Sequence, residues 1–132
     1  MKLRLALAVA GFGLLPAIPV AAHHSFAAEF DGTKAIRLRG TLTKIEWTNP
    51  HTYFYIDVKD ENGKVTNWNL ELANPNGLLR QGWERNSLKV GDQVTVEGSL
   101  AKDGSKTANA RSVTWSDGRV FAGSFGGGGS RQ

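Results

Sequence analysis

The chain has 132 residues, no cysteine and a formal net charge of +4 at pH 7. The absence of cysteine excludes disulfide bonds and thiolate metal sites. The 16 Lys and Arg residues are scattered among 12 Asp and Glu residues, without the basic cluster that is typical of a nucleic-acid interface. A chain of this length is expected to form one domain with one modest core.

Residues 1–22 have the three parts of a secretory signal peptide. Two cations open the segment, an apolar run follows, and the small residues Val20-Ala21-Ala22 close it at the positions that a signal peptidase reads. A retained membrane anchor is the alternative. Gly and Pro residues interrupt the run, however, and a spanning helix needs about 20 predominantly apolar residues. We therefore expect cleavage before His23 and a periplasmic mature protein without stable membrane insertion.

The first predicted strand follows a lead-in segment, residues 23–34, which shows no clear periodicity. From Ala35 onward, apolar and polar residues alternate with a period of two, which predicts a half-buried strand. The alternation slips at Lys44-Ile45, and this slip predicts a bend or bulge. Thr48-Asn49-Pro50 ends the strand, because proline lacks the N–H that a strand donates to its neighbour.

The remaining pattern alternates between strands and tight turns, with one short helix between the third and fourth strands. The later elements are strands at 52–58 and 65–72, a helix opened by Asn74-Pro75, a strand carrying Val94 and Val96, and a strand at 107–115. This order predicts an all-β domain over residues 35–121 with one small inserted helix, a five-stranded OB-like Greek-key barrel. An open β-sandwich-like meander is the alternative. The glycine-rich residues 122–132 are predicted to be a disordered tail.

The three histidines lie at the expected mature N-terminus and in the loop after the first strand: His23, His24 and His51. A free N-terminal amine and the imidazole of His23 can chelate a metal ion, and the ring of His24 or His51 would complete the set. Cu(II) accepts a tetragonal arrangement of such nitrogen ligands, so copper is favoured over zinc or nickel. The alternative is an exposed polar lead-in, with His51 hydrogen-bonded in a turn.

Other residues offer weaker candidates for chemistry. Ser25 stands beside His24, but adjacent side chains rarely form a nucleophile–base pair, and no oxyanion loop accompanies them. Tyr53 and Tyr55 face away from the predicted core and are candidates for stacking against a ligand ring. The tryptophans that are in phase with inward aliphatic residues are predicted to be core residues: Trp47, Trp68 and Trp115. No catalytic constellation is found, so an enzyme is not predicted.

Four stretches resemble the small exported bacterial proteins that are grouped as a domain of unknown function. They are HHSFAAEFD (23–31), GTLTKIEWTNPH (40–51), GW (82–83) and LKVGDQVTVEG (88–98). The resemblance covers most of the mature chain and implies a periplasmic location and a small β fold, without supplying an activity. Its paired HHSF and W-x-N-P-H motifs single out these residues for testing: His24, Ser25, Phe26, Asn49, Pro50 and His51.

The sequence therefore predicts a periplasmic module that binds a small ligand, a metal ion such as copper, through His23, His24 and His51. The alternative belongs to a different class of protein. It is a structural or accessory protein, without a metal, that docks a periplasmic protein partner through a barrel face or a sheet edge.

Overall fold

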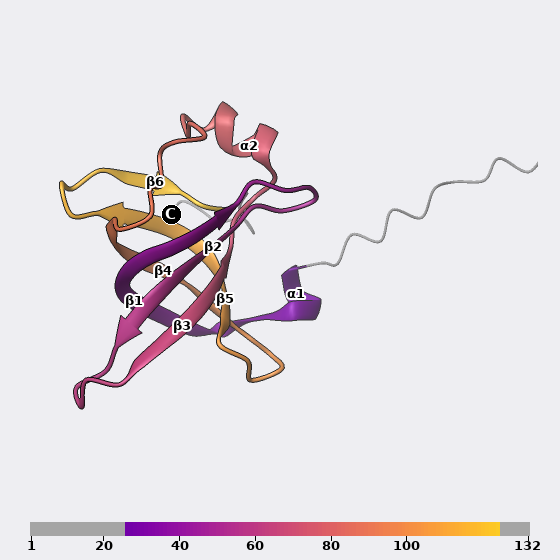
Figure 1. Cartoon of the computed structure of the whole chain (residues 1–132). Coiled ribbons are helices and arrows are strands. Elements are labelled where there is room, and N and C mark those ends of the chain that lie inside the picture. The colour runs from indigo at the N-terminus through magenta and orange to yellow at the C-terminus, as the bar shows by residue number, and fades with distance from the viewer. Residues whose placement is uncertain (1–25, 125–132) are drawn as a thin grey trace, which may run out of the picture.

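The computed structural model describes residues 26–124, a mostly β structure with six strands and two short helices (Figure 1). In chain order the elements are α1 (Phe26–Glu29), β1 (Phe30–Glu46), β2 (Tyr53–Lys59), β3 (Val65–Glu71), α2 (Pro75–Arg80), β4 (Gln93–Ala101), β5 (Thr107–Trp115) and β6 (Val120–Ala122). The predicted signal peptide, His23, His24 and nearly all of the predicted tail lie outside the described residues. Within residues 26–124, no helix is long and apolar enough to cross a bilayer.

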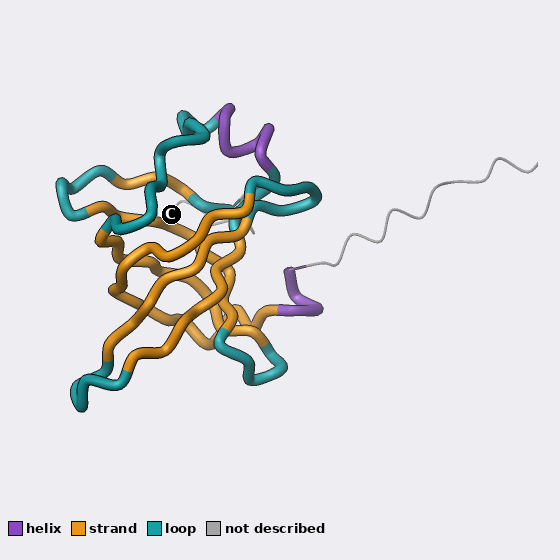
Figure 2. The backbone as a smooth tube through the Cα atoms, viewed as in Figure 1, coloured by secondary structure: helices purple, strands orange, loops and turns teal. Residues whose placement is uncertain are grey.

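The strands pair in the order β3-β2-β1-β4-β5-β6, and β5 also pairs with β3. The β3–β5 pair is parallel, whereas the other pairs are antiparallel. The β3–β5 pair joins β5 back to β3, the first strand of this order. The strands cross one another around a common interior (Figure 2). Among the described strands, β6 stands at the end of this order and pairs with β5 alone.

The long strand β1 begins at Phe30, earlier than the start at Ala35 that the sequence pattern predicts. Phe30 pairs with Ala101 of β4, and the register shifts before Ala35. This irregularity hides the period of two, because an inserted residue moves later side chains to the other face. The predicted slip near Lys44 is confirmed, since the β1–β2 register shifts between Leu42 and Lys44.

A single core cluster takes side chains from β1 to β5, from α2 and from the segment after α2. Trp115 is buried as predicted, whereas Trp47 and Trp68 pack against the cluster in partly buried positions. Trp83, in the segment after α2, is only 1% exposed. Its ring centroid lies 5.5 Å from that of Trp115 and 5.4 Å from that of Phe121. This aromatic group ties the α2 segment to β5 and β6.

The predicted start of α2 is confirmed. The side-chain oxygen of Asn74 accepts a hydrogen bond of 2.8 Å from the backbone N–H of Gly77. Because this bond satisfies an amide that the helix itself leaves unpaired, Asn74→Ala is expected to lower the free energy of unfolding by about 1 kcal/mol in urea denaturation. Asn76→Ala, at an exposed position in the same helix, is expected to leave stability nearly unchanged. Equal losses in the two variants would contradict a capping role.

Candidate functional site

His51 lies in the loop between β1 and β2 and faces Glu71 at the end of β3. The Nδ1 atom of His51 lies 3.3 Å from Oε1 of Glu71. The hydroxyl of Thr48 donates a hydrogen bond of 2.8 Å to the backbone carbonyl of His51, which fixes the loop locally. The rings of His51 and Tyr53 meet edge to face, with their centroids 6.4 Å apart. The Nε2 atom of His51 has no hydrogen-bond partner among residues 26–124, so it is available to a ligand.

Glu71 is buried, although it points away from the core that its neighbours in sequence, Leu70 and Leu72, enter. The residue is 7% exposed. Burial raises the pKa of the Glu71 carboxyl to about 7, and the negative charge of Glu29 adds to the rise. Burial and these two carboxylates also raise the pKa of Tyr53. At neutral pH the Glu71 carboxyl is therefore poised between its two protonation states, a property that is common in functional sites.

Glu71 belongs to a row of polar residues that crosses three neighbouring strands. Its Cα partner on β5 is Asn109, and the Cα partner of Asn109 on β4 is Ser99. All three residues are 7% exposed. Polar side chains on the outer face of a sheet are usually solvated, so the burial of this polar row shows that other parts of the chain cover it.

Two cavities meet at the polar row. The first has a volume of about 640 Å³, and its lining includes Tyr53, Asn69, Glu71, Lys102 and Asp103. The second has a volume of about 470 Å³, and its lining includes Phe26, His51, Glu71, Ser99, Asn109 and Arg111. Glu29, Phe30 and Glu71 line both cavities. Volumes of this size suit small molecules.

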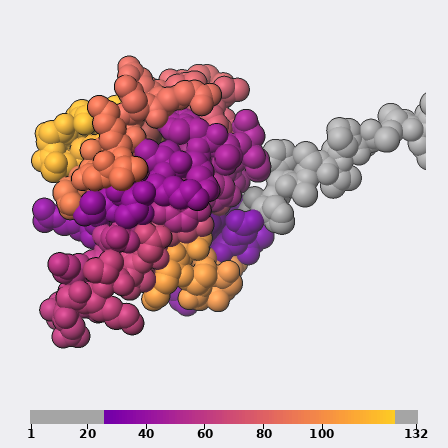
Figure 3. Space-filling model, in the orientation of Figure 1, coloured from indigo at the N-terminus to yellow at the C-terminus, as the bar shows by residue number. Residues whose placement is uncertain are grey.

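The helix α1 and the first residue of β1 form part of the wall of both cavities. The backbone N–H of Lys102, in the turn after β4, donates a hydrogen bond of 2.9 Å to the carbonyl of Glu29. The ammonium of Lys102 also contacts the carbonyl of Ala27. Phe26 stacks on Phe30 with ring centroids 5.6 Å apart. On the molecular surface, α1 (indigo) lies beside the β4–β5 turn (orange), as Figure 3 shows.

The structure brings two of the predicted site residues, Phe26 and His51, to the second cavity. Asn49 and Pro50 lie exposed in the loop before His51 and are joined by a cis peptide bond. His23, His24 and Ser25 lie outside the described residues. Within the described range, no group of three His, Cys, Asp or Glu side chains is placed to hold a metal ion. His51 is therefore the one residue of the predicted metal site that lies within residues 26–124.

The two tyrosines that were candidates for stacking occupy different surroundings. Tyr53 lines the first cavity. The hydroxyl of Tyr55 donates a hydrogen bond of 3.2 Å to the carboxylate of Glu46, and the ammonium of Lys44 lies 5.3 Å from the centre of the Tyr55 ring. Of the two rings, that of Tyr53 faces the candidate site.

Four residues of the second cavity were missed by reasoning from the sequence: Glu71, Ser99, Asn109 and Arg111. Each lies on a predicted strand at a position where a polar residue is ordinarily solvated. No local pattern distinguishes such a residue from one that a distant segment covers. For Glu71, Ser99 and Asn109 the covering segment is α1 with the start of β1, which the sequence pattern left without an assigned structure, whereas Arg111 remains exposed.

Taken together, these features define a small, mostly β protein with two cavities beside a pair formed by the partly exposed His51 and the buried carboxyl of Glu71. A model of the family of unknown function DUF6152 matches residues 14–110. The match covers most of the chain, and the protein belongs to this family. The resemblance to an uncharacterised domain family is thereby confirmed. Comparisons with curated proteins and with solved structures gave no match.

Proposed function

We propose that the protein is a periplasmic module that binds a metal ion, copper, through His51 together with His23 and His24. The observation that carries this proposal is the position of His51 against the buried carboxyl of Glu71. A histidine that ligates a metal commonly donates its other ring N–H to a carboxylate, which fixes the ring and its tautomer. In this chain, Nδ1 would face Glu71 and Nε2 would face the metal.

The covalent chain links the N-terminal histidines to the same cavity. Phe26 lines the second cavity with His51, and His24 precedes Phe26 by two residues. This closeness in the sequence supports a site that is shared by the N-terminal segment and the β1–β2 loop.

The donor set favours Cu(II). Its members are imidazole nitrogens and, after the expected cleavage, the amine of His23; this set suits Cu(II) better than hard, oxygen-binding cations. The expected cleavage would also remove Met1, the chain's one methionine, and so leave no sulfur ligand for Cu(I). Such a module would carry or buffer copper. We also propose that the strands form the OB-like five-stranded Greek-key barrel, which the order β3-β2-β1-β4-β5 and the parallel β3–β5 pair support.

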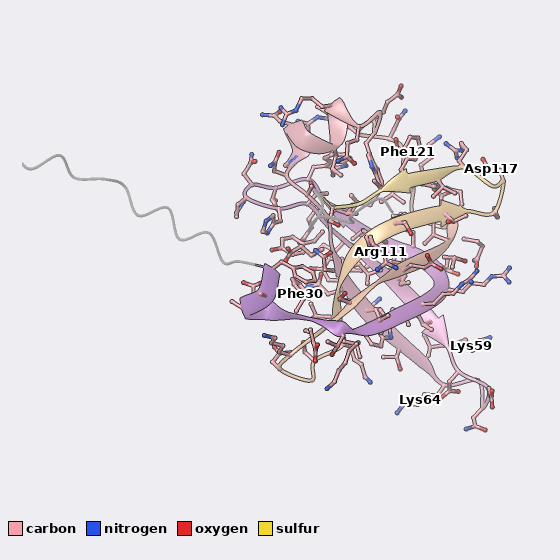
Figure 4. All side chains as sticks on the ribbon, turned by 180° about the vertical axis from the view of Figure 1, so that it is seen from behind. Phe30, Lys59, Lys64, Arg111, Asp117 and Phe121 are labelled. Atoms are coloured by element: carbon pink, nitrogen blue, oxygen red, sulfur yellow. The ribbon has the colours of Figure 1, made fainter. Side chains whose placement is uncertain are left out.

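The test is a calorimetric titration with Cu(II). The protein is purified after export, and its N-terminus is established by intact mass. His51→Ala is expected to weaken the affinity for Cu(II) at least tenfold, and Glu71→Gln about tenfold, since partners of ligating histidines typically contribute that much. The control is Lys59→Ala, at the far end of β2 from the loop (Figure 4). It is expected to bind Cu(II) as the wild type does.

Loose binding that His51→Ala leaves unchanged would overturn the proposal. It would favour the other class of function, docking to a periplasmic protein partner. A docking protein is expected to retain its partner in His23→Ala, His24→Ala and His51→Ala variants, whereas a copper carrier is expected to lose its metal in them.

A further inference from the structure

The second cavity contains polar groups that the copper proposal does not use. They belong to Ser99 and Asn109 from the polar row and to Arg111, an exposed residue that also lines the cavity. We propose that this cavity binds a small hydroxylated carboxylate of the sugar-acid type. Its carboxylate pairs with Arg111, and its hydroxyl groups hydrogen-bond with Asn109 and Ser99.

Asn109 and Ser99 offer polar groups to the cavity. Both residues are 7% exposed, and neither side chain hydrogen-bonds with another residue of the described range. Their polar atoms are not fully buried, so they remain accessible to water or to a ligand in the cavity. An amide offers two donors and an acceptor, and a hydroxyl can donate and accept. The cavity therefore presents unpaired sites of both kinds, which match the hydroxyl groups of a ligand.

Arg111 is presented at the cavity by an irregularity in β5. The register passes from Glu97–Ser112 to Gly98–Ala110, which leaves Arg111 as the additional residue of a β-bulge. Bulges of this kind redirect a side chain and occur preferentially near functional sites. Figure 4 shows Arg111 on the side of the molecule that also carries Phe30.

Two glycines permit the backbone to pack closely against this bulge. A Cβ atom at Gly98 would collide with the backbone carbonyl of Asn109, and one at Gly123 would collide with the carbonyl of Ala110. The N–H of Gly123 donates a hydrogen bond of 2.9 Å to the carbonyl of Arg111. The bulge is therefore held from both sides by positions that only glycine can occupy.

The charge of Arg111 determines the class of ligand. Its guanidinium forms no ion pair or hydrogen bond with another described residue, although Glu29 and Glu71 line the same cavity. The carboxyl of Glu71 faces His51 instead. A guanidinium binds a carboxylate through two parallel hydrogen bonds, a geometry that gives specificity as well as affinity.

The lining of the cavity also has apolar members. The stacked rings of Phe26 and Phe30 contribute to its lining and would pack against the C–H face of a sugar ring. Small-molecule sites typically combine such apolar walls with a few convergent polar groups. A carboxylate, several hydroxyls and an apolar face are together the features of a sugar acid.

The test is a titration of the full chain with D-glucuronate and D-gluconate, followed by amide chemical shifts in NMR spectra. The protein is first passed over a chelating resin, so that bound metal plays no part. Saturable shifts are expected at Ser99, Asn109 and Arg111, and D-glucose, which lacks the carboxylate, is expected to bind at least tenfold more weakly. Arg111→Gln is expected to weaken glucuronate binding by a similar factor, as is Asn109→Ala for its hydroxyl contacts.

The matched control is Arg39→Gln, which removes the same charge from an exposed position on β1. It is expected to bind glucuronate as the wild type does. Equal weakening in Arg39→Gln and Arg111→Gln would assign the binding to net charge and overturn the proposal. Equal binding of glucose, or the absence of saturable shifts with both acids, would also overturn it. Because the protein is free of metal, these outcomes are independent of the copper titration.

Discussion

Trp83→Ala is expected to lower the free energy of unfolding by about 4 kcal/mol, within the range for removing a large buried aromatic side chain. Trp83 is 1% exposed and packs against both Trp115 and Phe121. Its indole N–H donates a hydrogen bond of 2.8 Å to the carbonyl of Ala122 in β6. Truncation would thus leave a cavity among the aromatic rings and remove the hydrogen bond that fixes β6 to the segment after α2.

Urea denaturation measures the loss in the free energy of unfolding, and two further variants separate its causes. Trp83→Phe keeps an aromatic ring and loses the hydrogen bond, so it is expected to cost about 1–2 kcal/mol. Trp68→Ala removes an equally large side chain from a partly buried position and is expected to cost clearly less than Trp83→Ala. Equal losses in Trp68→Ala and Trp83→Ala would mean that the aromatic group around Trp83 does not carry the stability of this end of the fold.

Trp83 also shows where sequence patterns stop being informative about the fold. Strands and hairpin turns are periodic or chemically distinctive, so alternation and the Asn62-Gly63 turn are sufficient to predict them. The helix cap at Asn74 is recognisable for the same reason. Trp83 lies in a segment without regular structure, where no period indicates which side chains point inward. Its burial follows from contacts with β5 and β6, which are distant in sequence.

The candidate site was predictable only in part, and again the limit is distance along the chain. His51 is recognisable because histidines are rare in this sequence and the loop after the first strand is marked by Pro50. Glu71 and Asn109 have the alternation of ordinary solvated strand residues. They become unusual only because α1 and the start of β1 line the same cavity. The register shift in β1 obscured that segment in the sequence.

The second large effect concerns the dependence of stability on pH. Burial, with the charge of Glu29, raises the pKa of Glu71 from 4.5 to about 7 in the folded protein. The folded state therefore holds the proton more tightly than the unfolded state does. The stability that this proton gives the folded state is complete below about pH 4.5 and is lost as the pH rises through 7. The loss from this one group is on the order of 3 kcal/mol.

Glu71→Gln is expected to remove this loss, because glutamine has the same shape and no charge to bury. Relative to the wild type, the free energy of unfolding of the variant is expected to rise by on the order of 3 kcal/mol between about pH 4.5 and pH 8. Urea denaturation of metal-free protein across this range gives the difference directly. Glu84→Gln, at an exposed position, is expected to follow the wild type.

The groups that face Glu71 determine how the result is interpreted. The negative charge of Glu29 raises the cost of a charge on Glu71, and Tyr53 carries no charge at neutral pH. His51 is therefore the neighbour that is able to offset a negative charge on Glu71. If the difference between Glu71→Gln and the wild type stays constant across the range, the pKa of Glu71 must be the same in the folded and unfolded states. The polar row would then hold an anion beside His51 at neutral pH, and copper binding would gain a charged partner there.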